Sequence, residues 1–222
     1  MELNIKKAVK SLRPLKLAIS APSGAGKTFT ALTIASGIGK KILVIDTEKN
    51  SSTLYAKEFD FDVLDLQDRS VGNFMKILPE ITALNYDVIV LDSLSHFWES
   101  TLNFKADLDI AGGNSYTNWG KITPIWTKFI KAIVDCPIHT IVTFRAKTDY
   151  VLEQNEKGKQ APRKVGLAPI FREGAEYEFD IFANMDLQHN LIIEKTRFKE
   201  LDSQVINQPG QEFGVKILEL LK

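Results

Sequence analysis

The sequence is poor in the residues from which disulfide frameworks and protein-only metal sites are built. Cys136 is the only cysteine among 222 residues, which excludes an internal disulfide and suits a reducing compartment. The three histidines, at positions 96, 139 and 189, lie far apart and have no cysteine at ligand spacing. We therefore do not expect a metal site made entirely of protein side chains.

Long apolar runs and an excess of charge of one sign are also missing. No stretch approaches the roughly 20 apolar residues of a membrane-spanning helix, and the lysine-containing residues 1–12 hold no apolar run of signal-peptide length. The 28 basic and 28 acidic residues cancel, so contact with a polyanion requires a local patch. We expect a cytoplasmic protein, in the host cytoplasm if phage-encoded, with no membrane partner.

The sequence does contain a regular alternation of short apolar runs with helical patterns. Strands are expected over 15–19, 41–46, 61–66, 87–92 and 139–144, and helices up to 38 and over 71–84, 95–105 and 119–134. Such an alternation indicates the α/β class, with a mostly parallel sheet and helices on both faces. We expect a single domain over 1–222, with a core of about 13–200 and a short C-terminal helix over 212–221.

The pattern changes in the last third of the chain. The alternation is expected to end near Arg145, and a loop is expected earlier, over 106–118. Segments 148–152 and 164–167 flank a polar tip and indicate a protruding hairpin or mobile loop. Segments 179–185 and 191–195 indicate a second hairpin. We therefore expect C-terminal β-hairpins beside the parallel sheet.

Residues 21–28, Ala-Pro-Ser-Gly-Ala-Gly-Lys-Thr, lie between the first expected strand and the following helix. They match the P-loop pattern Gly-x-x-x-x-Gly-Lys-Ser/Thr, with alanine at the first glycine position. In this pattern backbone N–H groups surround phosphate oxygens, the lysine reaches the β- and γ-phosphates and the hydroxyl binds Mg²⁺. ATP and Mg²⁺ are thus the expected cofactors. The predicted nucleotide-binding residues are Pro22, Ser23, Gly24, Ala25, Gly26, Lys27, Thr28 and Phe29.

Two acidic residues at strand ends are candidates for handling the metal and the attacking water. Asp92 ends a buried apolar strand, as expected of a residue that holds Mg²⁺ through water together with Thr28. Because Ser93 follows it, the catalytic base must come from elsewhere, and Glu48 lies at the same sheet edge. The alternative is that Asp46 and Glu48 only shape the turn before Ser51.

Arg145 also follows a strand end, at 139–144. It could contact the γ-phosphate and report its loss to the segment that follows. The alternative is an exposed arginine in an ion pair that contributes little to stability.

Together these residues resemble the RecA-type P-loop core. Segment 45–48, Ile-Asp-Thr-Glu, resembles the RecA segment that carries the catalytic glutamate, and segment 90–93 resembles its Mg²⁺-coordinating strand. Arg145 stands where RecA has its sensor glutamine, which is a departure. The overall pattern over about 13–200 is most similar to phage-encoded, RecA-like single-strand annealing and recombination ATPases, often described as AAA-family ATP-binding proteins.

Segment 194–198, Glu-Lys-Thr-Arg-Phe, resembles the Lys-x-Arg-Phe element of RadA and DnaB-type proteins. That resemblance implies that Lys195 and Arg197 reach the nucleotide site of a neighbouring subunit, and hence a homo-oligomer, ring or filament. Residues two apart on a strand share a face, so the two cations could meet one phosphate. The alternative is a solvated basic surface.

A local basic segment offers a candidate surface for single-stranded DNA. It follows Arg145 and combines cations with one tyrosine, which suits phosphate contact and base stacking. RecA-like proteins have DNA-contacting loops in the corresponding place, but charge runs are often only solvated surface. The candidate residues are Lys147, Tyr150, Lys157, Lys159, Arg163 and Lys164.

Three functions remain open from the sequence. The first is an oligomeric, Mg²⁺-dependent ATPase that acts on single-stranded DNA in recombination, annealing or replication. The second is a P-loop kinase of another class, although the only insertion comparable to a kinase lid is lysine-rich. The third is a nucleotide-gated scaffold with little turnover, which the missing acid after Asp92 supports.

Overall fold

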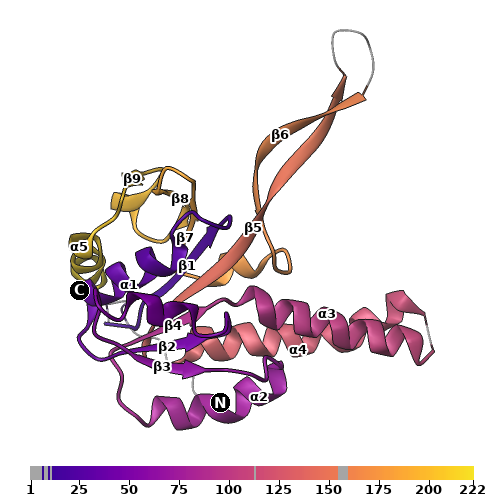
Figure 1. Cartoon of the computed structure of the whole chain (residues 1–222), viewed down its shortest axis with the longest axis horizontal. Coiled ribbons are helices and arrows are strands. Elements are labelled where there is room, and N and C mark those ends of the chain that lie inside the picture. Colours follow the sequence, from indigo (N-terminus) through magenta and orange to yellow (C-terminus); the bar gives the residue numbers. More distant parts are fainter. Residues whose placement is uncertain (1–6, 8–9, 11, 113, 155–159) are drawn as a thin grey trace.

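The computed structural model describes residues 7, 10, 12–112, 114–154 and 160–222, and its elements follow one another as Figure 1 shows. The strands are β1 (Lys16–Ala21), β2 (Ile42–Asp46), β3 (Asp62–Asp65), β4 (Val88–Asp92), β5 (His139–Gln154), β6 (Gln160–Pro169), β7 (Ile181–Met185), β8 (Asn190–Thr196) and β9 (Val205–Asn207). The helices are α1 (Lys27–Ile38), α2 (Val71–Thr82), α3 (Ser95–Ile110), α4 (Ser115–Asp135) and α5 (Gln211–Leu221), with 3₁₀ segments η1 (Ser51–Tyr55), η2 (Ala175–Glu178) and η3 (Lys199–Leu201). None of the described helices combines the length and apolar composition needed to cross a membrane.

The described strands form a nine-stranded sheet whose central part is parallel. In the order β3-β2-β4-β5-β1-β7 every neighbouring pair runs parallel, and β8 and β9 extend the sheet antiparallel from β7. All residues of β1, β2 and β4 are buried, as expected of parallel strands covered on both faces. The expected α/β P-loop fold with C-terminal antiparallel strands is confirmed.

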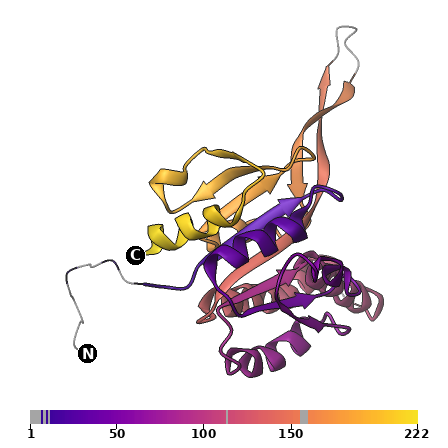
Figure 2. The ribbon, with the colours of Figure 1, turned by 60° about the vertical axis from the view of Figure 1, so that its left-hand side comes forward.

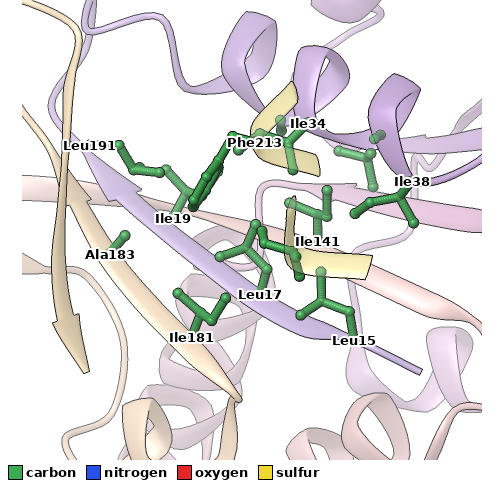
Figure 3. Close-up of a cluster of buried hydrophobic side chains, with 14 of the residues drawn as sticks. Leu15, Leu17, Ile19, Ile34, Ile38, Ile141, Ile181, Ala183, Leu191 and Phe213 are labelled. Carbon is green, nitrogen blue, oxygen red and sulfur yellow. The ribbon is translucent and has the colours of Figure 1, made fainter. Parts of the chain in front are cut away.

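Helices cover both faces of the sheet and enclose two apolar clusters. One cluster lies under α1 and α5, and the other lies under α2, α3 and α4. Figure 3 shows Ile19 of β1 gathered with Ile34 of α1 and Phe213 of α5 in the first cluster. Burying an aliphatic side chain of this size contributes about 1.5–3 kcal/mol. The two helices lie so close that a Cβ on Gly37 would be 2.0 Å from the Gln211 carbonyl oxygen.

β5 is longer than the sequence indicated and continues out of the sheet as an arm. The expected strand ended near Arg145, but a single strand runs on, and from Ala146 it pairs antiparallel with β6. Figures 1 and 2 show this β5–β6 arm projecting from the body of the molecule. The expected break was wrong because the ladder of the arm begins at the next residue, Ala146 opposite Pro169.

The connection between α3 and α4 is shorter than expected. Instead of a loop over 106–118, α3 runs to Ile110 and α4 begins at Ser115. Asn114 caps α4, and Asp109 accepts hydrogen bonds from Lys105 Nζ at 2.6 Å and from Ser115 Oγ at 3.0 Å. These polar residues, which indicated a loop, cap and link the two helices, so the expected loop was wrong in extent.

Candidate functional site

The segment between β1 and α1 forms a tight loop at the N-terminal end of α1. Gly24 and Gly26 have φ values of 83° and 82°, in the left-handed region that favours glycine. Ala25 N donates to Pro22 O at 3.3 Å, and Thr30 N donates to Gly26 O at 2.9 Å, so the helix starts where the loop ends. The first N–H groups of a helix lack intrahelical acceptors and, with the helix dipole, they favour an anion at this position.

Thr28 and Asp92 meet at the sheet edge beside this loop. Thr28 Oγ1 donates to Asp92 Oδ2 at 2.5 Å, and Thr143 Oγ1 of β5 donates to Asp92 Oδ1. Burial raises the pKa of Asp92, while the hydrogen bonds from Thr143 and Thr28 act to lower it. Because the Thr28 hydroxyl gives its hydrogen to Asp92, its lone pairs remain available to a cation.

These oxygens suit a hard cation such as Mg²⁺ that takes its other ligands from water and phosphate. Among the described residues, no group of three or more histidine, cysteine, aspartate or glutamate side chains could hold a metal ion by itself. The donor set around Thr28 and Asp92 therefore fits the predicted Mg²⁺ pair.

Asp46, at the end of β2, shapes the turn that presents Glu48. The Asp46 carboxylate accepts hydrogen bonds from Glu48 N at 2.6 Å, and from Ser52 N and Oγ at 2.9 and 2.6 Å. All the described hydrogen-bond partners of the Asp46 carboxylate are in this turn. Of the two acids, Asp46 holds the turn, while the Glu48 side chain extends toward the phosphate loop.

The Glu48 carboxylate lies between two cations. Its Oε1 lies 3.1 Å from Arg145 Nε and 4.0 Å from Lys27 Nζ. Arg145 also lies near Glu99, with Nη1 to Oε1 at 3.8 Å. The structure thus brings together three of the predicted catalytic residues, Lys27 of α1, Glu48 of the turn after β2 and Arg145 of β5.

The backbone of Arg145 is fixed at the base of the β5–β6 arm. Its N–H donates to Ser95 Oγ at 2.9 Å, and its carbonyl accepts from Ile170 N at 2.7 Å. Ser95 Oγ in turn donates to Ile170 O at 2.9 Å. The same residue therefore contacts Glu48 through its side chain and starts the arm through its backbone.

A cavity of about 810 Å³ adjoins the phosphate loop. Gly24 and Gly26 lie at one part of its wall, and Phe29, Tyr55 and Phe59 form an aromatic part. The Phe29 ring lies 5.8 Å from the Tyr55 ring and 5.1 Å from the Phe59 ring, both edge to face. An aromatic wall next to an anion site fits a planar base attached to phosphates.

Comparison with known families gives the decisive observation. A family described as an AAA domain matches residues 13–208, which is most of the 222-residue chain. The chain belongs to the AAA domain family. This family consists of P-loop ATPases of the AAA type, in agreement with the loop geometry at Gly24 to Thr28. Among curated proteins, no match is found.

Several residues of this AAA-domain site were missed from the sequence. Thr143 was considered only as part of a strand, although a hydroxyl near the carboxyl end of a parallel strand indicates a candidate partner for the acid on the neighbouring strand. Thr47 Oγ1 lies 2.6 Å from His96 Nδ1 and accepts a hydrogen bond from Ser93 N at 2.8 Å. Burial, and next the positive charge of Arg145, lower the pKa of His96. The position of His96 in the sequence gave no indication of its contact with Thr47.

Lys195 and Arg197 lie away from the phosphate loop of their own chain. Thr196 pairs with Ile181, which pairs with Leu17 at the beginning of β1, whereas the loop follows the end of β1. The four residue steps from position 17 to position 21 span about 13 Å along the strand. The structure therefore does not bring these two cations together with Lys27 and Glu48 of the same chain.

Both cations instead contact the η2 segment. Lys195 Nζ donates to Tyr177 O at 3.2 Å and to Phe179 O, and Arg197 Nη2 donates to Tyr177 O at 3.4 Å. Arg197 Nε also lies 3.6 Å from Asp180 Oδ1. Burial, and next the charge of Arg197, lower the pKa of Lys195. The two side chains share a face, as their spacing predicted.

The predicted DNA-binding residues fall on the β5–β6 arm or outside the described residues. Lys147 is exposed near the base of the arm, and Tyr150 pairs in register with Lys164 across the arm. Arg163 is the neighbouring residue of β6. Lys157 and Lys159 lie outside the residues that the structure describes.

Proposed function

We propose that this chain binds ATP with Mg²⁺, hydrolyses it through Glu48, and acts as an oligomer on single-stranded DNA in recombination, annealing or replication. The observation that carries the proposal is the meeting of Lys27, Glu48 and Arg145 beside the Thr28–Asp92 pair. These groups come from separate parts of the chain, and their arrangement supports a phosphate loop, a metal pair and a base at one site.

Nucleotide binding uses the loop and the adjoining aromatic cavity. The backbone N–H groups of Gly24 to Thr28 bind the β-phosphate oxygens, and Lys27 lies beside the γ-phosphate. The base packs in the cavity lined by Phe29, Tyr55 and Phe59. When bound through Thr28 and Asp92, Mg²⁺ supplies charge neutralisation for the β- and γ-phosphate oxygens.

Glu48 is the candidate base for the attacking water. A carboxylate at this edge would accept a proton from the water that attacks the γ-phosphorus, while the bond from that phosphorus to the oxygen of the leaving ADP breaks. Arg145 and Lys27 hold the carboxylate from two sides, and both cations can also attract the γ-phosphate oxygens. If Arg145 and Lys27 leave the Glu48 carboxylate for the γ-phosphate oxygens when ATP binds, the position of Glu48 depends on which nucleotide is bound.

Lys195 and Arg197 support an assembly with a shared site. Their place near the start of β1 suits contact with another copy, since their own phosphate loop lies at the opposite end of that strand. A contact that joins two different surfaces is heterologous, and repetition of it builds a ring or a filament.

The β5–β6 arm is the proposed DNA contact. An isolated two-stranded ribbon is at best marginally stable in water, so a bound partner would stabilise an arm of this length. The basic residues predicted along it suit phosphate, and Arg145 at its base links it to Glu48. DNA binding to the arm would thereby affect hydrolysis.

The test is ATP turnover with and without single-stranded DNA over a series of salt concentrations. The proposal predicts Mg²⁺-dependent turnover that DNA stimulates, with a stimulation that fades as salt rises, because phosphate contacts release counterions. DNA-independent turnover at every salt concentration would contradict the DNA part of the proposal.

A nucleotide-gated scaffold with little turnover is the second candidate. It is favoured by the double engagement of Glu48, whose Oε1 faces both Arg145 and Lys27. In that case ATP binds tightly, and the wild-type chain and a Glu48→Gln variant hydrolyse it equally slowly.

A further inference from the structure

The turn between β7 and β8 places His189 against the phosphate loop. His189 Nδ1 lies 2.9 Å from the carbonyl oxygen of Ala25, a residue 164 positions away in the chain. A carbonyl oxygen can only accept a hydrogen bond, so Nδ1 must carry the hydrogen. The contact therefore fixes His189 as a donor to the backbone of the loop.

The turn that carries His189 is held by Asp186. The Asp186 carboxylate accepts hydrogen bonds from Gln188 N and Asn190 N, both at 2.9 Å, and from Asn190 Nδ2 at 2.8 Å. His189 N donates to Asp186 O at 3.1 Å. These bonds keep His189 at a φ of 64°, in a region that residues with a Cβ adopt uncommonly.

The loop is shaped to admit the imidazole. Gly26 has a φ of 82°, and a Cβ at this position would lie 3.2 Å from His189 Nδ1. That separation is tighter than ordinary packing, so the missing side chain of Gly26 makes room for His189. The P-loop glycine and the histidine of the distant turn therefore fit together.

The contact between His189 and the Ala25 carbonyl also determines the direction in which the Gly26 N–H points. In a trans peptide the C=O of one residue and the N–H of the next point in opposite directions within one plane. Because the Ala25 carbonyl faces His189, the Gly26 N–H faces the other way. An N–H of this loop must point toward the phosphate oxygens if it is to bind them.

We propose that His189 is a positioning residue of the nucleotide site, which holds the Ala25–Gly26 peptide so that the Gly26 N–H binds phosphate. The inference rests on the proposed nucleotide binding and adds to it a residue outside the P-loop pattern. Gln208 N donates to His189 O at 3.1 Å, and both residues line the cavity next to the loop. The C-terminal part of the chain thus sets the geometry of the phosphate loop.

The test compares two substitutions of His189 in the full chain. His189→Leu removes the donor and keeps much of the side-chain volume. His189→Asn keeps an amide N–H near the position of Nδ1, and asparagine tolerates the left-handed backbone. Because His189 is an exposed residue, we expect an effect of a few fold: about three- to tenfold weaker binding for Leu, and less than about twofold for Asn.

Binding is measured by calorimetry with ADP and, separately, with pyrophosphate, which carries only the phosphates. The inference predicts that the His189→Leu variant has lower affinity for both ligands, by the same factor, and that the His189→Asn variant recovers both affinities. It is overturned if Leu leaves both affinities unchanged, if Leu weakens ADP alone, or if Asn is as impaired as Leu. A wild-type chain that binds neither ligand would overturn the proposed nucleotide binding as well. Failure of the proposed function is therefore distinguishable from failure of the His189 inference alone.

Discussion

Arg145 Nε lies 3.1 Å from Glu48 Oε1, and this contact joins the base of the β5–β6 arm to the candidate catalytic carboxylate. The two residues are 97 positions apart: Glu48 follows β2, and Arg145 lies within β5, at the end of the part that pairs in parallel with β1. The carboxyl ends of parallel strands share one sheet edge, which is why the contact forms. Under the proposed function, this contact connects a partner bound to the arm with hydrolysis at Glu48.

Replacing Glu48 by glutamine should separate binding from hydrolysis. Glutamine keeps the size of the side chain but cannot accept a proton, so we expect turnover to fall by about 100-fold or more. ATP affinity should change little, as measured by calorimetry. Glu99→Gln is the matched control, since Glu99 also lies near Arg145, at 3.8 Å, but is not at the loop. Equal turnover in the Glu48 variant and the wild type would remove Glu48 from the chemistry.

Replacing Arg145 by alanine should lower turnover and uncouple it from DNA. Loss of the guanidinium frees the Glu48 carboxylate from one of its two cations, and we expect turnover about 10- to 100-fold lower. Stimulation by single-stranded DNA should disappear. Arg145→Lys retains the charge and should recover part of the turnover. If the alanine variant responds to DNA as strongly as the wild type, the link through Arg145 is wrong.

Replacing Asp92 by asparagine should stabilise the fold while it abolishes Mg²⁺-dependent turnover. Burial raises the pKa of Asp92, so its favourable contribution is complete below the ordinary pKa of 3.8 and is lost as pH rises through the raised value. At a pH where Asp92 is ionised, the asparagine variant avoids the buried charge, and we expect its melting temperature to rise by a few degrees, roughly 1 kcal/mol.

Thermal unfolding of the Asp92→Asn variant and the wild type at several pH values checks this prediction. The stability difference should shrink as pH falls toward the range in which Asp92 becomes protonated. A variant that is less stable than the wild type at neutral pH would show that the Thr28 and Thr143 hydrogen bonds outweigh the cost of burying the charge.

Mixing two inactive variants should test whether the site is shared between copies. A Lys195→Ala subunit supplies an intact loop, and a Lys27→Ala subunit supplies an intact basic pair. An equal mixture should regain about a quarter of the wild-type turnover, because one in four random neighbour pairs joins the two intact halves. A mixture of Lys27→Ala with Glu48→Gln should stay inactive, since both lesions lie in the same half. Lack of rescue in confirmed mixed assemblies would count against the shared site.

The sequence predicted those parts of the site that depend on local pattern. The loop at 21–28, the strand ending at Asp92 and the position of Glu48 follow from apolar runs and strand ends, because a parallel sheet aligns its strand ends. The separation of roles between Asp46 and Glu48 could not be predicted, because it depends on which carboxylate turns back toward Ser52.

Long-range contacts account for most of what the sequence did not show. His189 meets Ala25 only because β7 pairs with β1, and that pairing has no local signal. The continuous course of β5 past Arg145 likewise depends on pairing with β6 rather than on composition. Residues whose role depends on such pairing look like ordinary turn or strand residues until the fold is known.

The most direct test of the account is the affinity of ATP with Mg²⁺ for the wild-type chain and for Lys27→Ala, measured by calorimetry. The Lys27 ammonium is the charged group of the phosphate loop, and its loss should weaken binding by about 100-fold. The account predicts one site per chain in the wild type and little or no detectable binding in the variant. Equal affinity in the two chains would contradict the assignment of residues 21–28 as the nucleotide-binding loop.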